Sequence, residues 1–118
     1  MGRELFSMFV NSYLDMIGRV LRGEFQLIPE LLDPEKVKRI FETDCMEIIN
    51  AYRNGKISGE LAMRNLFLLK SYVVSQLLIH SERLKRLAEE KGLKTEKKIC
   101  AEDVNEIALM IDEREREL

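Results

Sequence analysis

The chain has 118 residues, of which 46% are hydrophobic and 34% charged, with a formal net charge of −2. This length is enough for one domain with its own apolar core, and we expect a single helical domain over residues 1–118. The mixed charges give no general reason to expect nucleic acid as the partner. Two cysteines, one histidine and no CxxC spacing argue against zinc and iron–sulfur sites. We therefore predict no metal and no cofactor.

The same composition also indicates in which cellular compartment the protein works. Two cysteines without a disulfide framework are typical of a reducing compartment, so we expect a cytoplasmic protein. The abundance of Glu, Lys and Arg beside only two Gln is a pattern found in proteins of thermophiles.

Residues 4–22 are predicted to form the first helix. Apolar residues cover about half of its circumference, with Asn11, Asp15 and Arg19 opposite, as in a core helix. A membrane-surface helix would usually have a polar face rich in Lys and Arg. Asn11 and Asp15 also interrupt the apolar run that a secretion signal needs. We expect neither membrane binding nor secretion.

Residues 25–32 contain Pro29, which predicts a connector or a helical turn packed on the bundle. A second long helix is predicted from Pro34 to Arg53, with Asp33 as its cap and the proline where a missing N–H costs nothing. Asn54-Gly55 is expected to end this helix, because both residues tolerate the positive φ of a left-handed helix terminus. The buried face should comprise Val37, Ile40, Phe41, Cys45, Ile48 and Tyr52.

Residues 58–91 form the helix around which the others are expected to gather. Ser58 is its cap, Gly92 its stop, and no proline interrupts it. At about 100° per residue, one narrow stripe is polar and most of the remaining circumference is apolar. The stripe comprises Glu60, Arg64, Ser71, Ser75, Glu82, Arg86 and Glu89.

A helix that contacts water only along one stripe must have the rest of its surface covered by several other helices. This is the position of the middle helix in a bundle. Arg64, Lys70 and Gln76 interrupt its apolar stretch and argue against a membrane span. With a final helix at about residues 101–115, the predicted fold is all-α. It is a helical bundle of four main helices around one long central helix (58–91).

The central helix also predicts self-association. About 33 residues make a helix of about 50 Å, whereas a compact domain of this length has a diameter of about 35 Å. An overhanging end would expose Leu84, Leu87 and Ala88, so we predict a homodimer or larger homo-oligomer with its interface there. The alternative is a kink near Ser81-Glu82 that folds the end back and leaves a monomer.

Two charges fall on apolar faces, Asp44 on the second helix and Lys70 on the central one. Because a lone buried charge costs several kcal/mol, we predict that they pair. The alternative is that Lys70 reaches water along its aliphatic stem while Asp44 sits at a helix edge.

The sequence contains few residues in a pattern suited to catalysis. His80 lies toward the apolar arc and is expected to be partly buried with a local hydrogen bond. Helical nucleotide pyrophosphatases hold magnesium with acidic residues three apart on two helices. The corresponding residues here, Asp44 with Glu47 and Asp103 with Glu106, do not converge in projection. We predict no catalytic residue, with a metal-dependent nucleotide pyrophosphatase as the third hypothesis.

The segment Lys94-Thr95-Glu96-Lys97-Lys98-Ile99-Cys100-Ala101-Glu102-Asp103-Val104 resembles the loop and third-helix start of archaeal histones and other histone-fold proteins. Ser58, which opens the long helix, with Ala62 four residues on, is similar to the start of the histone middle helix. The resemblance covers residues 58–111, about half the chain. It implies contacts to the DNA backbone by Lys94, Thr95, Lys97 and Lys98.

The leading hypothesis is a non-enzymatic helical interaction module that self-associates or docks on a helical partner protein. A histone-fold-like protein that acts on DNA or in a DNA-bound complex is the alternative. DNA binding requires the basic loop, which separates the two.

Overall fold

The protein is described from a computed structural model, which covers residues 13–24, 26–27, 29–94 and 96–118. Every regular element in these ranges is helical, so the predicted all-α bundle is confirmed. Residues 4–12 of the predicted first helix lie outside the described ranges. The elements are α2 (Tyr13–Leu21), the 3-10 helix η1 (Pro29–Leu32), α3 (Pro34–Arg53), α4 (Gly59–Tyr72), the π-helix η2 (Val73–Leu77), α5 (Leu78–Glu90) and α6 (Ala101–Glu115).

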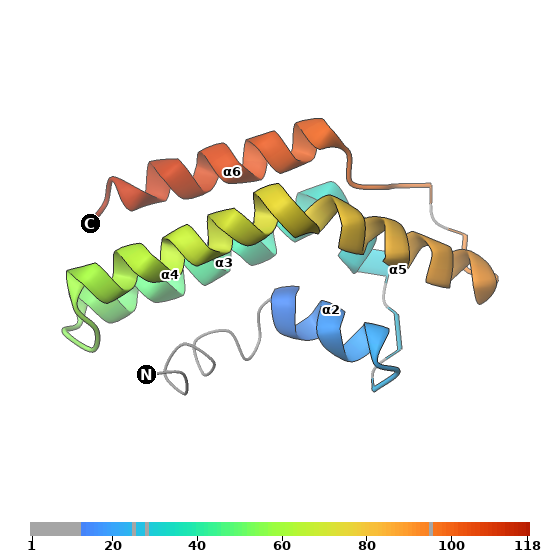
Figure 1. The fold of residues 1–118 in the computed structure, drawn as a ribbon, viewed down its shortest axis with the longest axis horizontal. Coiled ribbons are helices and arrows are strands. Elements are labelled where there is room, and N and C mark those ends of the chain that lie inside the picture. The colour runs from blue at the N-terminus through green and yellow to red at the C-terminus, as the bar shows by residue number, and fades with distance from the viewer. Residues whose placement is uncertain (1–12, 25, 28, 95) are drawn as a thin grey trace.

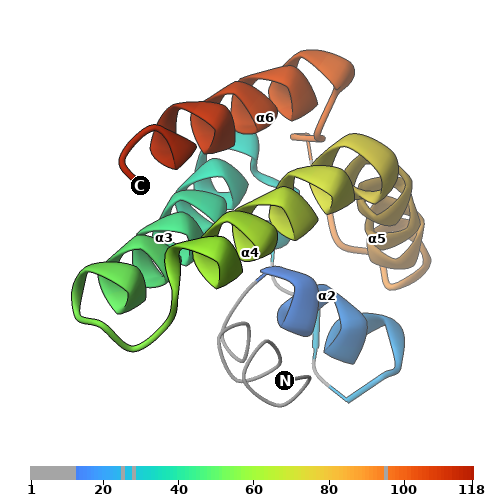
Figure 2. The same cartoon turned by 60° about the vertical axis from the view of Figure 1, so that its left-hand side comes forward.

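The segments α4, η2 and α5 follow one another without a loop and form the central helix, which we call the rod. Figure 1 shows that the rod changes direction between α4 and α5. The helices α3 and α6 pack against α4 and against each other, while η1 and α2 pack against α5. Figure 2 shows α6 and α2 on opposite sides of this rod. The predicted arrangement around one long central helix is therefore present.

The helix ends follow the predicted capping residues. The Asp33 side chain accepts a hydrogen bond from the Glu35 backbone N–H at 3.1 Å, and Ser58 accepts one from that of Leu61 at 3.1 Å. Gly55 and Gly92 each have a φ of 72° and end α3 and α5. These local signals are readable because a cap involves neighbours in the sequence.

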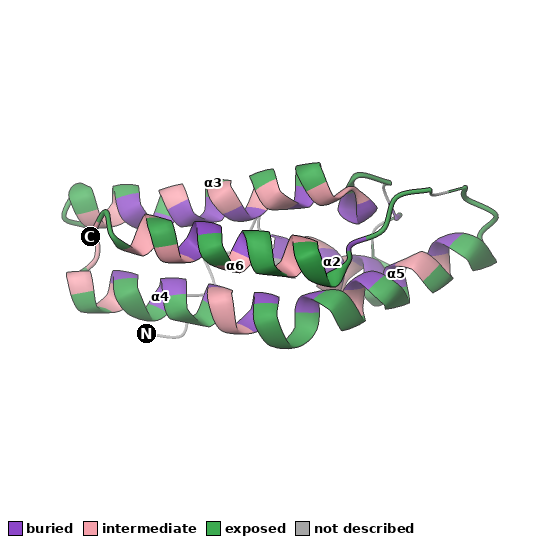
Figure 3. Cartoon of the chain, turned by 90° about the horizontal axis from the view of Figure 1, so that it is seen from above, coloured by how far each residue is buried: buried purple, intermediate pink, exposed green. Residues whose placement is uncertain are grey.

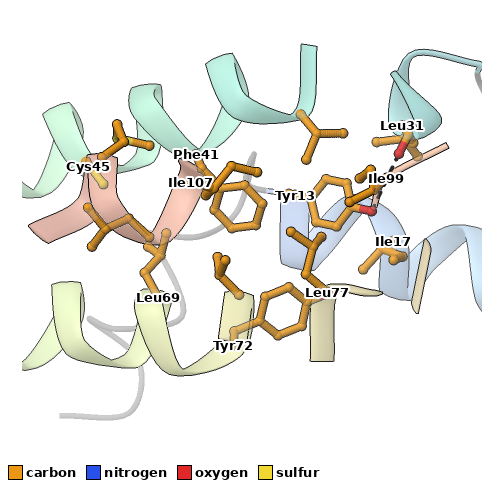
Figure 4. Packing of buried hydrophobic residues seen from close by; sticks show 14 of the residues in the cluster. Tyr13, Ile17, Leu31, Phe41, Cys45, Leu69, Tyr72, Leu77, Ile99 and Ile107 are labelled. Carbon is orange, nitrogen blue, oxygen red and sulfur yellow. Dashed lines mark hydrogen bonds between the residues drawn. The ribbon is translucent and has the colours of Figure 1, made fainter. Parts of the chain in front are cut away.

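The core is centred on three aromatic rings from three helices (Figure 4). The ring centroids of Tyr13 and Phe41 lie 5.3 Å apart, and those of Phe41 and Tyr72 lie 6.3 Å apart. The Tyr13 hydroxyl donates to the Leu31 carbonyl oxygen at 3.5 Å, which joins α2 to η1. These contacts connect the first part of the chain to both α3 and the middle of the rod.

The predicted overhang of the central helix is wrong. The molecule measures 47 × 29 × 19 Å, so it is elongated along the rod, and a sphere was the wrong estimate of its shape. Leu84 and Ala88 are fully buried within the chain, and Leu87 is half-buried. The rod continues as regular α-helix through Ser81-Glu82, so neither the exposed strip nor the alternative kink occurs there.

The irregularity lies instead in η2, where the hydrogen bonding widens to a π-helix. Along the whole rod one seam faces inward: Ala62, Leu66, Leu69, Val73, Leu77, Ser81, Leu84 and Ala88 are all buried. In an uninterrupted helix at about 100° per residue, Ala88 would lie about 80° away from Ala62. A π segment accommodates one extra residue. It therefore keeps the two halves of the seam on the same side.

Deleting Gln76, an exposed residue of η2, should therefore be tolerated. The rod would become a regular α-helix with Leu77, Leu84 and Ala88 still inward. We expect a loss of less than about 1.5 kcal/mol in the free energy of unfolding, measured by urea denaturation.

The matched control is deletion of Arg83, an exposed residue in the regular helix α5. That deletion turns either Leu77 with Ser81 or Leu84 with Ala88 away from the core, and it should cost about 3 kcal/mol or more. Equal losses in the two deletion variants would contradict the role given to η2.

Candidate functional site: the outer face of the central rod

The side of the rod that points away from α3 carries large apolar side chains in contact with solvent. Phe67, Val74 and Ile79 are 68%, 62% and 53% exposed. Figure 3 shows exposed residues recurring along α4 and α5 on the side away from α3. We call this surface the outer face. It comprises Glu60, Met63, Arg64, Phe67, Leu68, Ser71, Val74, Ser75, Leu78, Ile79, Glu82 and Arg86.

The polar stripe predicted from the sequence is the solvent side, with Glu60, Arg64 and Ser75 exposed and Ser71 half-buried. Sequence reasoning missed the apolar neighbours of the stripe, because it assigned all of them to the core. One signal was available. Leu77, Leu78 and Ile79 are consecutive and span about 200° of a helix, so they cannot all face one core.

A shallow groove of about 420 Å³ runs between the rod and α6 beside this face. Phe67, Val74 and Ser75 line its rod side, and Asp112 lies on its α6 side. The Lys70 Nζ lies 2.8 Å from the Asp112 Oδ1, with both side chains about 40% exposed. The groove thus combines apolar side chains with a neutralised ion pair.

The predicted pairing of Asp44 with Lys70 is therefore wrong, because Lys70 pairs with α6 rather than α3. Asp44 is 5% exposed on α3 and accepts a hydrogen bond from the Tyr13 backbone N–H. Burial, followed by the negative charge of Glu47, raises the pKa of Asp44 to about 7, and the Tyr13 N–H partly opposes this. The carboxyl group holds α2 against α3.

His80 is partly buried and has a local hydrogen bond, as predicted. Its Nδ1 lies 2.7 Å from the hydroxyl oxygen of Tyr72, and the two rings lie 5.5 Å apart. Burial and then the nearby charge of Arg83 lower the pKa of His80. This bond spans η2, so it ties the two ends of the π segment together.

The four carboxylates considered for magnesium have separate roles. Asp44 is buried and Glu47 exposed. The Asp103 Oδ2 accepts from the Cys100 backbone N–H at 2.8 Å and from its thiol at 3.0 Å, which caps α6, and Glu106 pairs with Lys38 at 3.8 Å. Within the described residues, no group of three or more His, Cys, Asp or Glu is placed to hold a metal ion.

The hollow where the basic loop meets η1 and α3 is lined by as many carboxylates as lysines. Lys97 pairs with Asp33 at 3.2 Å, and Lys36 pairs with Glu30 at 3.8 Å. Glu96 lines the same hollow, together with Lys94. Lys98 is exposed, and Thr95 lies outside the described residues. The lysines that the histone resemblance assigned to DNA are thus not a continuous cationic surface.

None of the helices in the described part of the chain is long and apolar enough to cross a membrane.

The fold and this face define a single all-α bundle built on an interrupted central helix with one apolar side open to solvent. The chain belongs to the AF0941-like family, whose pattern matches residues 7–118. It is 50% identical over 113 residues to an uncharacterised protein of Archaeoglobus fulgidus, an alignment that covers 94% of this chain and 99% of that protein.

A solved structure, the predicted coding region AF0941 from Archaeoglobus fulgidus, superposes with a TM-score of 0.81 at 50% identity. The match covers 90% of this chain and 93% of the other. Family membership over nearly the whole chain overturns the resemblance of residues 58–111 to archaeal histones. The shared segment reflects a helix start with acidic residues near the positive end of its dipole.

The buried Asp44 predicts a particular dependence of stability on pH. Its folded-state pKa is raised to about 7 from 3.8, so folding favours its protonated form. The stability that Asp44 contributes is complete below about pH 4 and is lost as the pH rises to about 7. Relative to the wild type, Asp44→Asn should gain about 2 to 4 kcal/mol between pH 4 and pH 8.

The measurement is urea denaturation of both proteins at each pH. Both are needed because the lowered pKa of His80 also makes stability depend on pH, with the opposite sign. Glu47→Gln removes an exposed carboxylate one turn away and should show a much smaller change. A stability difference between wild type and Asp44→Asn that does not vary with pH would contradict the raised pKa.

Proposed function

We propose that the chain is a non-enzymatic helical interaction module that associates through the outer face of its central rod. The observation that carries this proposal is the exposure of Phe67, Val74 and Ile79 along one face. Single exposed apolar residues are ordinary on protein surfaces, but apolar residues gathered along one helix face favour a contact surface.

The energetics support the same proposal. Burying one large apolar side chain stabilises a contact by about 1.5 to 3 kcal/mol, so Phe67, Val74 and Ile79 together would contribute about 4 to 9 kcal/mol against the entropy lost on association. None of them belongs to the core cluster of buried residues. Their apolar character is therefore available for a partner without loss of the fold.

A helix is the occupant that this surface fits best. An apolar row on one helix packs with a similar row on another, with side chains of one fitting between those of the next. A second copy of the chain supplies such a row, and we propose it as the principal partner. A helix of another protein is the second candidate, favoured by the groove between the rod and α6.

We propose the cytoplasm as the location. Cys45 and Cys100 are both free thiols, which fits a reducing compartment. Burial, and then the charge of Asp44, raise the pKa of the Cys45 thiol to about 12. Cys45 is thereby suited to packing rather than to chemistry.

Light scattering tests the self-association. We expect a mass of twice 13.8 kDa for the wild type at about 100 µM, because dimerisation depends on protein concentration. Phe67→Glu with Val74→Glu places charges in the contact and should return the mass to 13.8 kDa with an unchanged circular dichroism spectrum.

Leu93→Glu is the matched control, since Leu93 is exposed in the loop after α5 and should leave the mass doubled. A wild type that remains at 13.8 kDa at about 100 µM would rule out the proposed self-association.

A further inference from the structure

We propose that a second hollow, between α5 and the start of α6, binds a small oxyanion: a free phosphate ion or the phosphate group of a small molecule. We call it the α5–α6 hollow. Binding there requires no second copy of the chain. The volume of the hollow is about 210 Å³, which is below the ~300 to 1,000 Å³ of sites for drug-sized ligands. Its lining comprises Leu78, Ser81, Glu82 and Lys85 of α5, followed by Lys98, Ile99, Cys100 and Ala101 where the chain enters α6.

The two sides of the α5–α6 hollow are held by different parts of the fold. Ser81 and Lys85 are four residues apart on α5, so their side chains project from the same side of that helix. The chain leaves α5 at its far end and returns beside it to the start of α6 (Figure 1). Ile99 is 3% exposed and packs into the core, which fixes the returning segment. The walls of the hollow are therefore in place before a ligand binds.

Lys85 brings to the hollow a cation that has no carboxylate partner. The half-buried lysines of the described chain are Lys38, Lys70 and Lys85. Lys38 and Lys70 each pair with a carboxylate of α6, that of Glu106 and that of Asp112. Among the described residues, no carboxylate lies within ion-pair distance of the Lys85 ammonium. Since a charge partly withdrawn from water is stabilised by a counter-ion, this lysine favours an anion in the hollow.

A buried hydroxyl is the second and independent observation. Ser81 lies on the inward seam and is 2% exposed, but it also lines the α5–α6 hollow. Its hydroxyl has no hydrogen-bond partner in the part of the chain that the structure describes, whereas that of Ser75 donates to the Ser71 carbonyl oxygen at 2.6 Å. Burial without a partner deprives a hydroxyl of its hydrogen bond to water. An oxyanion in the hollow accepts that hydrogen bond.

The start of α6 adds the positive end of a helix. Ala101 is the first residue of α6 and lines the hollow. The first N–H groups of a helix have no carbonyl acceptor within it, and they attract anions. The Asp103 carboxylate accepts from the Cys100 N–H at 2.8 Å. The N–H groups that a ligand meets are therefore those of Ala101 and Glu102.

The charges around the hollow match those of a phosphate group. Lys85 and Lys98 contribute two positive charges and Glu82 one negative charge, in a chain whose formal net charge is −2. The two acidic residues in the first turn of α6 do not line the hollow. A phosphate group carries a charge of about −1.5 to −2 at pH 7 and accepts strong hydrogen bonds through three oxygens. Ammonium, hydroxyl and backbone N–H groups are all suitable donors.

NMR of the backbone amides during a phosphate titration tests the site. When inorganic phosphate replaces chloride at constant ionic strength, the N–H signals of Ala101 and Glu102 should shift and saturate, with a Kd of about 1 mM. Lys85→Met and Ser81→Ala each remove one donor, and each should raise this Kd about five- to ten-fold. Circular dichroism establishes that both variants keep the helical content of the wild type.

Lys91→Met is the matched control. Lys91 is exposed at the end of α5 and does not line the hollow, so its substitution removes the same charge from the same helix. The Kd should stay within about two-fold of the wild-type value, because an exposed charge outside the site is screened.

The same titration with glycerol 3-phosphate distinguishes the two sources of the phosphate group. Tighter binding of the ester than of inorganic phosphate indicates a small phosphorylated molecule, and weaker binding indicates the free ion.

The lysine variants decide between a site and general charge attraction. A saturable shift that Lys85→Met weakens and Lys91→Met does not supports the proposed site. Shifts that stay linear up to about 20 mM phosphate, or equal losses of affinity in the two lysine variants, overturn it. Light scattering measures self-association separately, so failure of one proposal leaves the other standing.

Discussion

One extra residue in the central rod is the constraint on which the rest of the structure depends. A rod of this length cannot keep a single apolar seam inward as a regular helix, because 3.6 residues per turn cause the seam to rotate away over seven turns. The π segment from Val73 to Leu77 absorbs that rotation. Both halves of the rod consequently serve the same core, with α3 and α6 packed on α4, and α2 and η1 packed on α5.

The π segment also lies beside the aromatic rings at the centre of the core. Tyr72 precedes it and contacts both Tyr13 and Phe41, while its hydroxyl meets His80 on the far side of the segment. A widened turn has poorer backbone geometry than an α-helix, and such turns recur at functional sites. Here the ring contacts and the hydrogen bond hold the segment from both ends. The helix thus changes register at one defined place.

Much of this fold is predictable from the sequence, and the failures have a common cause. Caps at Asp33 and Ser58 involve neighbouring residues, so local chemistry specifies them. The pairing of Asp44 with Lys70 failed because a helical projection shows which face is apolar but not which helix will cover it. The interface at Leu84 failed because a spherical estimate replaced the elongated shape. The apolar part of the outer face was missed because the projection assigned every apolar residue of the central helix to the core, although consecutive apolar residues such as Leu77, Leu78 and Ile79 cannot all face one side.

The inward seam and the outer face of the rod differ in what they contact. The inward seam packs the rod against the rest of the chain, and its residues Leu66, Leu77 and Leu84 are all buried. Phe67, Val74 and Ile79 add nothing to that packing, and leaving them exposed has a cost in hydration free energy. Polar residues at these positions would fold as well or better. The self-association proposed above would account for these apolar side chains as a contact made after folding.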